Sequence, residues 1–206
     1  MLPEGLVDGN GDTLGNATDW CCNFTDSGQD DVAYLTSLVD EARTHAPVGD
    51  ILAVGHSNGG FMAYRLACVG MPGLKGIASL AGTSYSDPAP CDSAPPVSVL
   101  HFHGDDDVVV RYDGQAPTDE NPGYSGAEAE VRRWATRAGC GAEDAAAPVT
   151  VDIESVIEGA ETVVTRFNQG CSAPVTIDLW RIGGATHIPS FKSDIGERVV
   201  GWLLSV

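Results

Sequence analysis

Residues 55–60, Gly-His-Ser-Asn-Gly-Gly, are the part of the chain that most restricts its fold. The residues before them, Ile-Leu-Ala-Val, suit a buried strand, and those after them suit a helix. A serine at such a strand-to-helix turn, with Gly55 and Gly59 where a Cβ would collide with neighbouring backbone, is typical of a nucleophile elbow. We therefore predict that Ser57 is a nucleophile, and that the backbone N–H of Asn58 stabilises an oxyanion.

The composition indicates a single domain, residues 1–206, with 43% hydrophobic residues to form its core. There are 11 lysine and arginine residues against 29 aspartate and glutamate residues, a formal net charge of −18. This charge repels phosphate groups, so we expect no nucleic acid and no anionic membrane as partners. No apolar run approaches a membrane span, and the first residues are neither basic nor apolar enough to begin a signal peptide.

Six cysteines indicate an oxidising compartment, because their spacing matches no zinc site. The preferred bridges are Cys68–Cys91 and Cys140–Cys171. The adjacent pair at 21–22 stays unassigned. The alternative is that the cysteines are buried free thiols.

One acidic segment, residues 8–12, spaces its side-chain oxygens as a calcium-binding loop does. Thr13 stands where such a loop needs glycine, and Asp19 stands where it needs a bidentate glutamate. We therefore predict a protein without a metal ion, and the sequence indicates no other cofactor.

The spacing of apolar and capping residues predicts alternating helices and strands. Besides the helix that follows the elbow, helices are predicted at 27–45, 125–139 and 193–204, the first two with capping boxes formed by Ser27 with Asp30 and by Ser125 with Glu128. Strands are predicted at 51–54, 76–80, 97–103 and 175–182, with an antiparallel edge at 149–153 and 162–167. This order implies a mainly parallel sheet flanked by helices, with its active groups at the carboxyl ends of the strands.

Candidates for an acid and a base follow two of these strands. Three aspartates, residues 105–107, come after the strand at 97–103, and His187 lies in a glycine-rich loop after the last strand. The order serine, acid, histidine is that of the α/β-hydrolases, in which the histidine takes the serine proton and the carboxylate orients the histidine. Spacing alone does not choose among the three aspartates.

The other four histidines are less suited to act as the base. His45 lies at the carboxyl end of a helix, where its charge interacts with the helix dipole. His56 is adjacent to the serine, so we expect it to form a wall of the site and to contact the substrate. His101 and His103 share one strand face and are interpreted as packing or pocket residues with satisfied ring nitrogens.

The run from Gly55 to Cys68, together with Asp30-Asp31-Val32 and His101-Phe102-His103-Gly104, resembles the polyhydroxybutyrate depolymerase and feruloyl esterase-like group of secreted α/β-hydrolases. That group also has a tryptophan helix ending in Gly-Cys, as here at 134–140, and a G-G-x-H turn, to which Gly-Gly-Ala-Thr-His at 183–187 is similar with one more residue before the histidine.

The H-G-T-x-D-x-x-V-P-Y segment of the group, placed on residues 103–112, implies that Asp107 is the triad acid. Asp105 stands where the group has threonine, and Arg111 stands where it has proline. Ile188 occupies the position of a tryptophan that usually follows the catalytic histidine, so we assign it to substrate contact beside His56.

The group begins with several strands and a histidine-glycine loop that supplies a second oxyanion donor, a region that this chain lacks. We therefore expect an α/β-hydrolase fold without the first strands of the family. The exposed sheet edge is expected to be covered by a homodimer or by a rearranged loop.

The resemblance implies a serine esterase that acts on a small-molecule or polymeric ester. Candidate substrates are polyhydroxyalkanoate-type or synthetic aromatic polyesters and feruloyl esters. The cysteines and the resemblance together imply an extracellular enzyme. Two alternatives remain open: a non-catalytic, truncated hydrolase that binds a ligand, and a peptidase, which shares the same triad.

Overall fold

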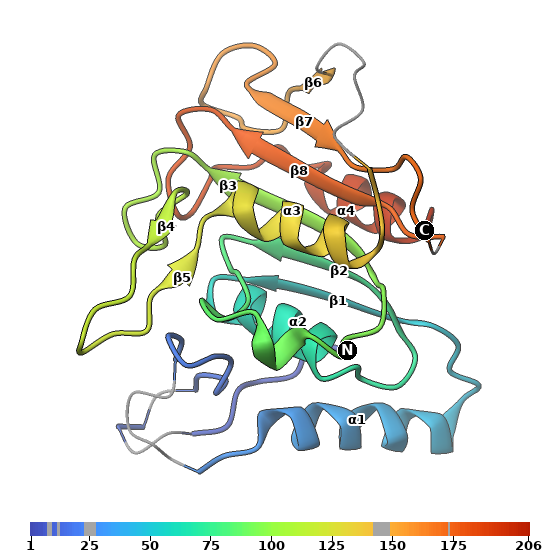
Figure 1. The fold of residues 1–206 in the computed structure, drawn as a ribbon. Coiled ribbons are helices and arrows are strands. Elements are labelled where there is room, and N and C mark those ends of the chain that lie inside the picture. The colour runs from blue at the N-terminus through green and yellow to red at the C-terminus, as the bar shows by residue number, and fades with distance from the viewer. Residues whose placement is uncertain (8–9, 12, 23–27, 142–148, 173) are drawn as a thin grey trace.

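The computed structural model describes residues 1–7, 10–11, 13–22, 28–141, 149–172 and 174–206. In this part of the chain, a six-stranded sheet has the order β1-β2-β3-β8-β7-β6 (Figure 1). Its strands are β1 (Ile51–His56), β2 (Leu74–Leu80), β3 (Ser98–Gly104), β8 (Ile177–Ile182), β7 (Thr162–Arg166) and β6 (Val149–Val151). The first four of these pair in parallel, whereas β8 with β7 and β7 with β6 pair antiparallel. The mainly parallel sheet and its antiparallel edge are thus confirmed.

Helices cover both faces of this sheet. Helices α2 (Asn58–Cys68) and α3 (Ala127–Arg137) lie on one face, and α4 (Ile195–Leu203) lies on the other (Figure 1). The strand side chains alternate accordingly: Val99 belongs to the hydrophobic cluster under α2 and α3, and its neighbour Leu100 belongs to the cluster under α4. Burial on both faces explains why the parallel strands are nearly continuous apolar runs.

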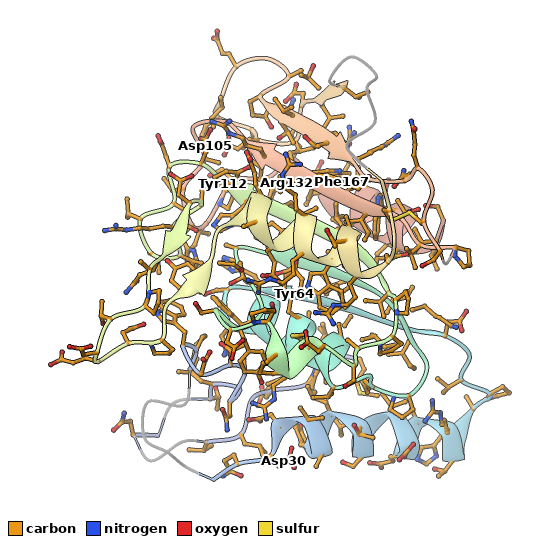
Figure 2. All side chains as sticks on the ribbon, viewed as in Figure 1. Asp30, Tyr64, Asp105, Tyr112, Arg132 and Phe167 are labelled. Carbon is orange, nitrogen blue, oxygen red and sulfur yellow. A yellow bond between two sulfur atoms is a disulfide. The ribbon has the colours of Figure 1, made fainter. Side chains whose placement is uncertain are left out.

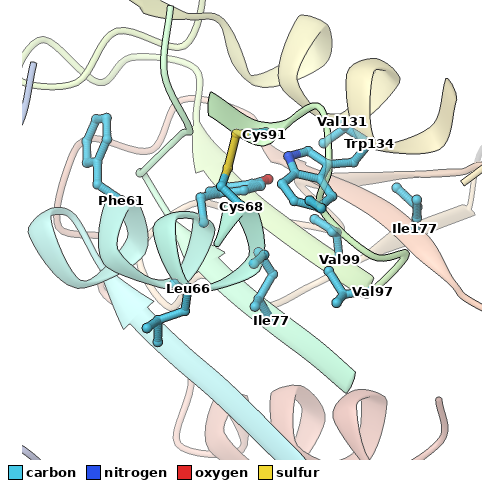
Figure 3. Packing of buried hydrophobic residues seen from close by; sticks show 14 of the residues in the cluster. Phe61, Leu66, Cys68, Ile77, Cys91, Val97, Val99, Val131, Trp134 and Ile177 are labelled. Atoms are coloured by element: carbon cyan, nitrogen blue, oxygen red, sulfur yellow. A yellow bond between two sulfur atoms is a disulfide. The ribbon is translucent and has the colours of Figure 1, made fainter. Parts of the chain in front are cut away.

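The cluster under α2 and α3 contains the largest buried side chains (Figure 3). Trp134 of α3 is 1% exposed and belongs to the core. Its ring packs against Tyr64 of α2, with 5.8 Å between the ring centroids. The two helices are therefore joined by aromatic packing over the centre of the sheet.

Helix α1 (Asp31–His45) lies beyond the β1 end of the sheet (Figure 1). It begins later than predicted, because Asp30 is its N-cap and accepts a hydrogen bond from the N–H of Ala33 at 2.9 Å (Figure 2). Ser27, the predicted capping residue, lies outside the described residues. A cleft of about 530 Å³ separates α1 from β1, and residues 1–5 also line it.

The predicted capping box of α3 is wrong. The helix begins at Ala127, its N-cap is Gly126, and no side chain caps it. The hydroxyl of Ser125 instead donates to the buried carboxylate of Glu130, which also accepts a hydrogen bond from the Trp134 ring. Ser125 ends the short strand β5 (Tyr124–Ser125), which pairs with β4 (Gly114–Gln115), so it precedes the N-cap of the helix.

All six cysteines lie in the described part of the chain and form disulfides. The predicted bridges Cys68–Cys91 and Cys140–Cys171 are both present, and the unassigned neighbours at 21–22 are joined to each other. The alternative of free thiols is therefore wrong. The Cys68–Cys91 bridge links the end of α2 to the short 3-10 helix η1 (Ala89–Cys91) (Figure 3).

The described residues lack two features that are typical of other protein classes. No helix there is long and apolar enough to cross a membrane. No group of three or more histidine, cysteine or acidic side chains there is arranged to hold a metal ion. Asp8, Gly9 and Asp12 of the acidic segment lie outside this part of the chain.

Candidate active site

The elbow serine lies between β1, which ends at His56, and α2, which begins at Asn58. Ser57 has φ 53° and ψ −117°, a conformation that side-chain-bearing residues rarely adopt. The N–H of Ser57 donates to the carbonyl of Leu80 in the next strand at 2.8 Å, which fixes the turn against the sheet.

The structure confirms the predicted steric role of Gly55 but not that of Gly59. A Cβ on Gly55 would lie 2.0 Å from the carbonyl oxygen of Gly59, so only glycine fits there. A Cβ on Gly59 itself would meet no atom within 4 Å, so its predicted steric role is wrong. Gly60 carries that role instead, because its Cβ would lie 2.6 Å from the Ser79 hydroxyl oxygen.

The structure brings together the three side chains that the sequence selected. The Ser57 hydroxyl lies 3.0 Å from Nε2 of His187, and Nδ1 of His187 lies 2.7 Å from Oδ2 of Asp107. Ser57 follows β1, Asp107 follows β3 and His187 follows β8, so all three lie at the carboxyl ends of parallel strands. This position is where active groups gather in open α/β sheets.

Contacts distinguish the three consecutive aspartates. The Asp105 carboxylate forms an ion pair with Arg181 at 2.9 Å and accepts the N–H of Gly184 at 2.6 Å. Asp106 is exposed, whereas Asp107 is 5% exposed and faces His187. The position that the family pattern gives to the acid is therefore the one that contacts the histidine.

The Asp107 carboxylate is surrounded by hydrogen-bond donors. Its Oδ1 accepts the backbone N–H groups of Val109 at 2.8 Å and Val110 at 2.9 Å, and its Oδ2 lies 3.3 Å from Nε2 of His103. Burial alone would raise the pKa of Asp107, but the hydrogen bonds from His103, His187 and these two N–H groups lower it to about 2. The carboxylate is therefore ionised at neutral pH and can stabilise a positive charge on His187.

His56 contacts the backbone of the loop that holds the base. Its Nε2–H donates to the carbonyl oxygen of His187 at 2.8 Å, and the two ring centroids are 4.9 Å apart. Partial burial against this loop lowers the pKa of His56 below its ordinary value. Ile188, the other residue assigned to substrate contact, has 74% of its surface exposed. Substrate contact by these two side chains stays a prediction.

Asn58 joins the elbow to the N-terminal segment. Its side-chain amide exchanges two hydrogen bonds with the backbone of Gly15, at 2.8 Å and 2.7 Å, and its Nδ2 lies 3.6 Å from the sulfur of Cys21. Its backbone N–H belongs to the first residue of α2, where an N–H has no partner within the helix. The pairing with Gly15 joins residues 43 positions apart, so no local sequence pattern predicts it.

His101 and His103 are fully buried, as expected of packing residues, and both nitrogens of each ring have a partner. The contact of His103 with Asp107 was missed. The signal for it was the spacing His103-x-x-x-Asp107 directly after a buried strand.

The fold and this site define a mixed α/β protein with a hydrogen-bonded serine, histidine and aspartate at the carboxyl edge of its sheet. No family model matches the chain. NocK of Nocardia uniformis subsp. tsuyamanensis, a protein named as an esterase, is 39% identical over 93 residues, which are 43% of this chain and 27% of NocK.

Two proteins named as feruloyl esterases match longer stretches. Feruloyl esterase C of Aspergillus clavatus is 26% identical over 156 residues, 74% of this chain and 49% of that protein. Feruloyl esterase B of Piromyces equi is 26% identical over 194 residues, 88% of this chain and 31% of that protein. The chain thus spans at most about half the length of these relatives.

Proposed function

We propose that this chain is a serine esterase with an α/β-hydrolase fold. The observation that carries the proposal is the continuous hydrogen-bonded path from the Ser57 hydroxyl through the His187 ring to the Asp107 carboxylate. A serine hydroxyl is a weak nucleophile until a neighbouring base accepts its proton, and the base needs a third group to orient it. The similarity to proteins named as esterases supports the same chemistry.

The reaction proceeds through an acyl-enzyme. Ser57 Oγ attacks the ester carbonyl carbon while Nε2 of His187 accepts the hydroxyl proton. The resulting imidazolium is stabilised by Asp107, and it returns the proton to the alkoxide leaving group as the carbon–oxygen bond of the ester breaks. A water molecule, activated by the same ring, then releases the acid and restores Ser57.

The N–H of Asn58 is the oxyanion donor in this mechanism. It lies at the start of α2, where the helix dipole also favours negative charge. Loss of one oxyanion donor typically reduces turnover by about two to three orders of magnitude. The Asn58 N–H is therefore expected to contribute a factor of about this size to turnover.

We place feruloyl esters first among the substrates, because two relatives of broad coverage are named as feruloyl esterases. Polyhydroxyalkanoate-type and synthetic aromatic polyesters come second, on the motifs shared with the depolymerase group. An extracellular location is part of the same proposal, since three disulfides are stable only under oxidising conditions.

Hydrolysis of p-nitrophenyl acetate and butyrate by the purified chain, beside Ser57→Ala and His187→Ala, tests the proposal. We expect turnover in the unmodified chain and loss of it in both variants. Methyl ferulate, methyl acetate and polyhydroxybutyrate film then rank the substrate classes. If the folded chain does not exceed its variants on any ester, but binds feruloyl compounds in a titration, it is a ligand-binding relative rather than an enzyme.

A further inference from the structure

A chain of buried polar side chains continues behind the triad acid. His101 and His103 of β3 and Tyr64 of α2 are all 0% exposed. Nε2 of His103 lies 3.3 Å from the Asp107 carboxylate, Nδ1 of His103 lies 3.2 Å from Nε2 of His101, and Nδ1 of His101 lies 2.9 Å from the Tyr64 hydroxyl. Tyr64, labelled in Figure 2, thus reaches from α2 to His101 of the central strand β3. Five groups are thus linked from Tyr64 to His187.

The partners of His103 determine which of its nitrogens carries a proton. Nε2 lies 2.8 Å from the carbonyl oxygen of Val110 and 3.3 Å from Oδ2 of Asp107. A carbonyl and an ionised carboxylate only accept hydrogen bonds, so Nε2 of His103 must be the donor.

The partners of His101 determine the direction of the remaining bonds. Burial holds the pKa of His101 well below its ordinary value, so this ring is neutral. If its Nδ1 carried the proton, the Tyr64 hydroxyl would have to accept, and the hydroxyl proton would have no acceptor among the described residues. Tyr64 therefore donates to Nδ1 of His101, and Nε2–H of His101 donates to Nδ1 of His103.

We propose that His103 is a positioning residue for Asp107, held in its neutral Nε2–H form by the directed chain from Tyr64 through His101. This inference rests on the proposed function, because Asp107 acts there by orienting His187. Two backbone N–H groups hold Oδ1 of Asp107, and His103 is the side chain that shares Oδ2 with His187. A neutral His103 leaves the negative charge of Asp107 available to the His187 imidazolium.

Nitrogen NMR of the histidine rings tests the proton positions directly in the full chain. We expect His103 and His101 each to have a protonated Nε2 and an unprotonated Nδ1 at neutral pH. Protonation of Nδ1 on His103 would overturn the proposal. This readout does not depend on turnover, so it is distinguishable from a failure of the proposed esterase activity.

Kinetics of three variants test the positioning role. His103→Gln retains an amide donor near the place of Nε2 and should keep kcat within about threefold, whereas His103→Leu removes the donor and should lower kcat about tenfold to hundredfold with little change in KM. Tyr64→Phe keeps the ring but removes the first donor, and should both shift the His101 tautomer in the NMR spectrum and lower kcat severalfold.

Tyr112→Phe is the matched control for these variants. Its ring also packs against His103, with 5.6 Å between centroids, but its hydroxyl lies toward Glu128 and outside the chain of bonds. It should leave kcat and the histidine tautomers unchanged. Unfolding curves verify that each variant is folded, and an unaltered kcat in folded His103→Leu would contradict the proposal. If that variant does not fold, unaltered tautomers and kcat in Tyr64→Phe contradict it equally.

Discussion

The ring of His56 donates a hydrogen bond to the backbone carbonyl of His187 at 2.8 Å, so the residue before Ser57 holds the loop that carries His187. The two histidines are 131 positions apart in the chain. We infer from this contact that His56 orients His187, a role different from the substrate contact predicted from the sequence.

Replacing His56 by alanine should therefore lower kcat by about fivefold to tenfold, the value of one lost hydrogen bond, and change KM little. Steady-state hydrolysis of p-nitrophenyl esters with short and long acyl groups measures both constants. A KM that rises for the longer acyl group at constant kcat would favour substrate contact instead. His45→Ala, at a 75% exposed histidine of α1, is the control.

Asp107 should make stability depend on pH in the acid range. Its pKa is about 2 in the folded protein against a reference value of 3.8, so it stabilises the fold fully above about pH 4 and loses this contribution as pH falls toward 2. The shift corresponds to about 2 kcal/mol. The difference in unfolding free energy between the unmodified chain and Asp107→Asn should shrink by this amount between pH 5 and 2, as measured by urea denaturation. The exposed Asp106→Asn should show no such change.

The Cys68–Cys91 bridge should contribute strongly to stability. It joins residues 23 positions apart, and both sulfur-bearing residues are at most 2% exposed. By the loop-closure argument, replacing both cysteines with alanine should lower the free energy of unfolding by about 3 kcal/mol. Urea unfolding of the double variant measures this loss, and a decrease below about 1 kcal/mol would mean that α2 and η1 are held mainly by packing.

The homodimer stays a prediction, and β1 is the strand on which it depends. β1 lies at one edge of the sheet, next to the cleft under α1, and Val54 on it is 58% exposed. An edge strand of this kind can pair with a second copy. Light scattering should give twice the 21.4 kDa of one chain, and Val54→Lys should shift the mass toward the monomer. A monomeric mass for the unmodified chain would refute the dimer.

The parts of the site that the sequence predicted are those encoded by adjacent residues. Ser57 was identifiable because a strand, a glycine-flanked turn and a helix follow one another, and His187 because one histidine lies in a glycine-rich loop after the last strand. Asp107 was not identifiable from spacing. The two carboxylates differ in their tertiary contacts, because Asp105 pairs with Arg181 and Gly184 whereas Asp107 faces His187.

The parts that were missed depend on contacts between distant segments. The amide of Asn58 pairs with the backbone of Gly15, and no local pattern encodes a contact over 43 positions. The predicted start of α3 is wrong because the Ser125 hydroxyl donates to the buried carboxylate of Glu130 and so does not cap the helix. In both cases a tertiary contact determines the hydrogen-bond partner of the side chain, and local sequence propensity does not distinguish that partner from the alternatives.

The positive φ of Ser57 implies that the proposed nucleophile lowers the stability of the folded protein. At φ 53°, a serine carries strain that glycine would not, so Ser57→Gly should abolish turnover and yet raise the free energy of unfolding by about 1 kcal/mol. Urea denaturation of Ser57→Gly beside Ser57→Ala, which keeps a Cβ, measures this gain. Selection for stability alone would then replace Ser57 with glycine, whereas selection for the proposed activity retains the serine.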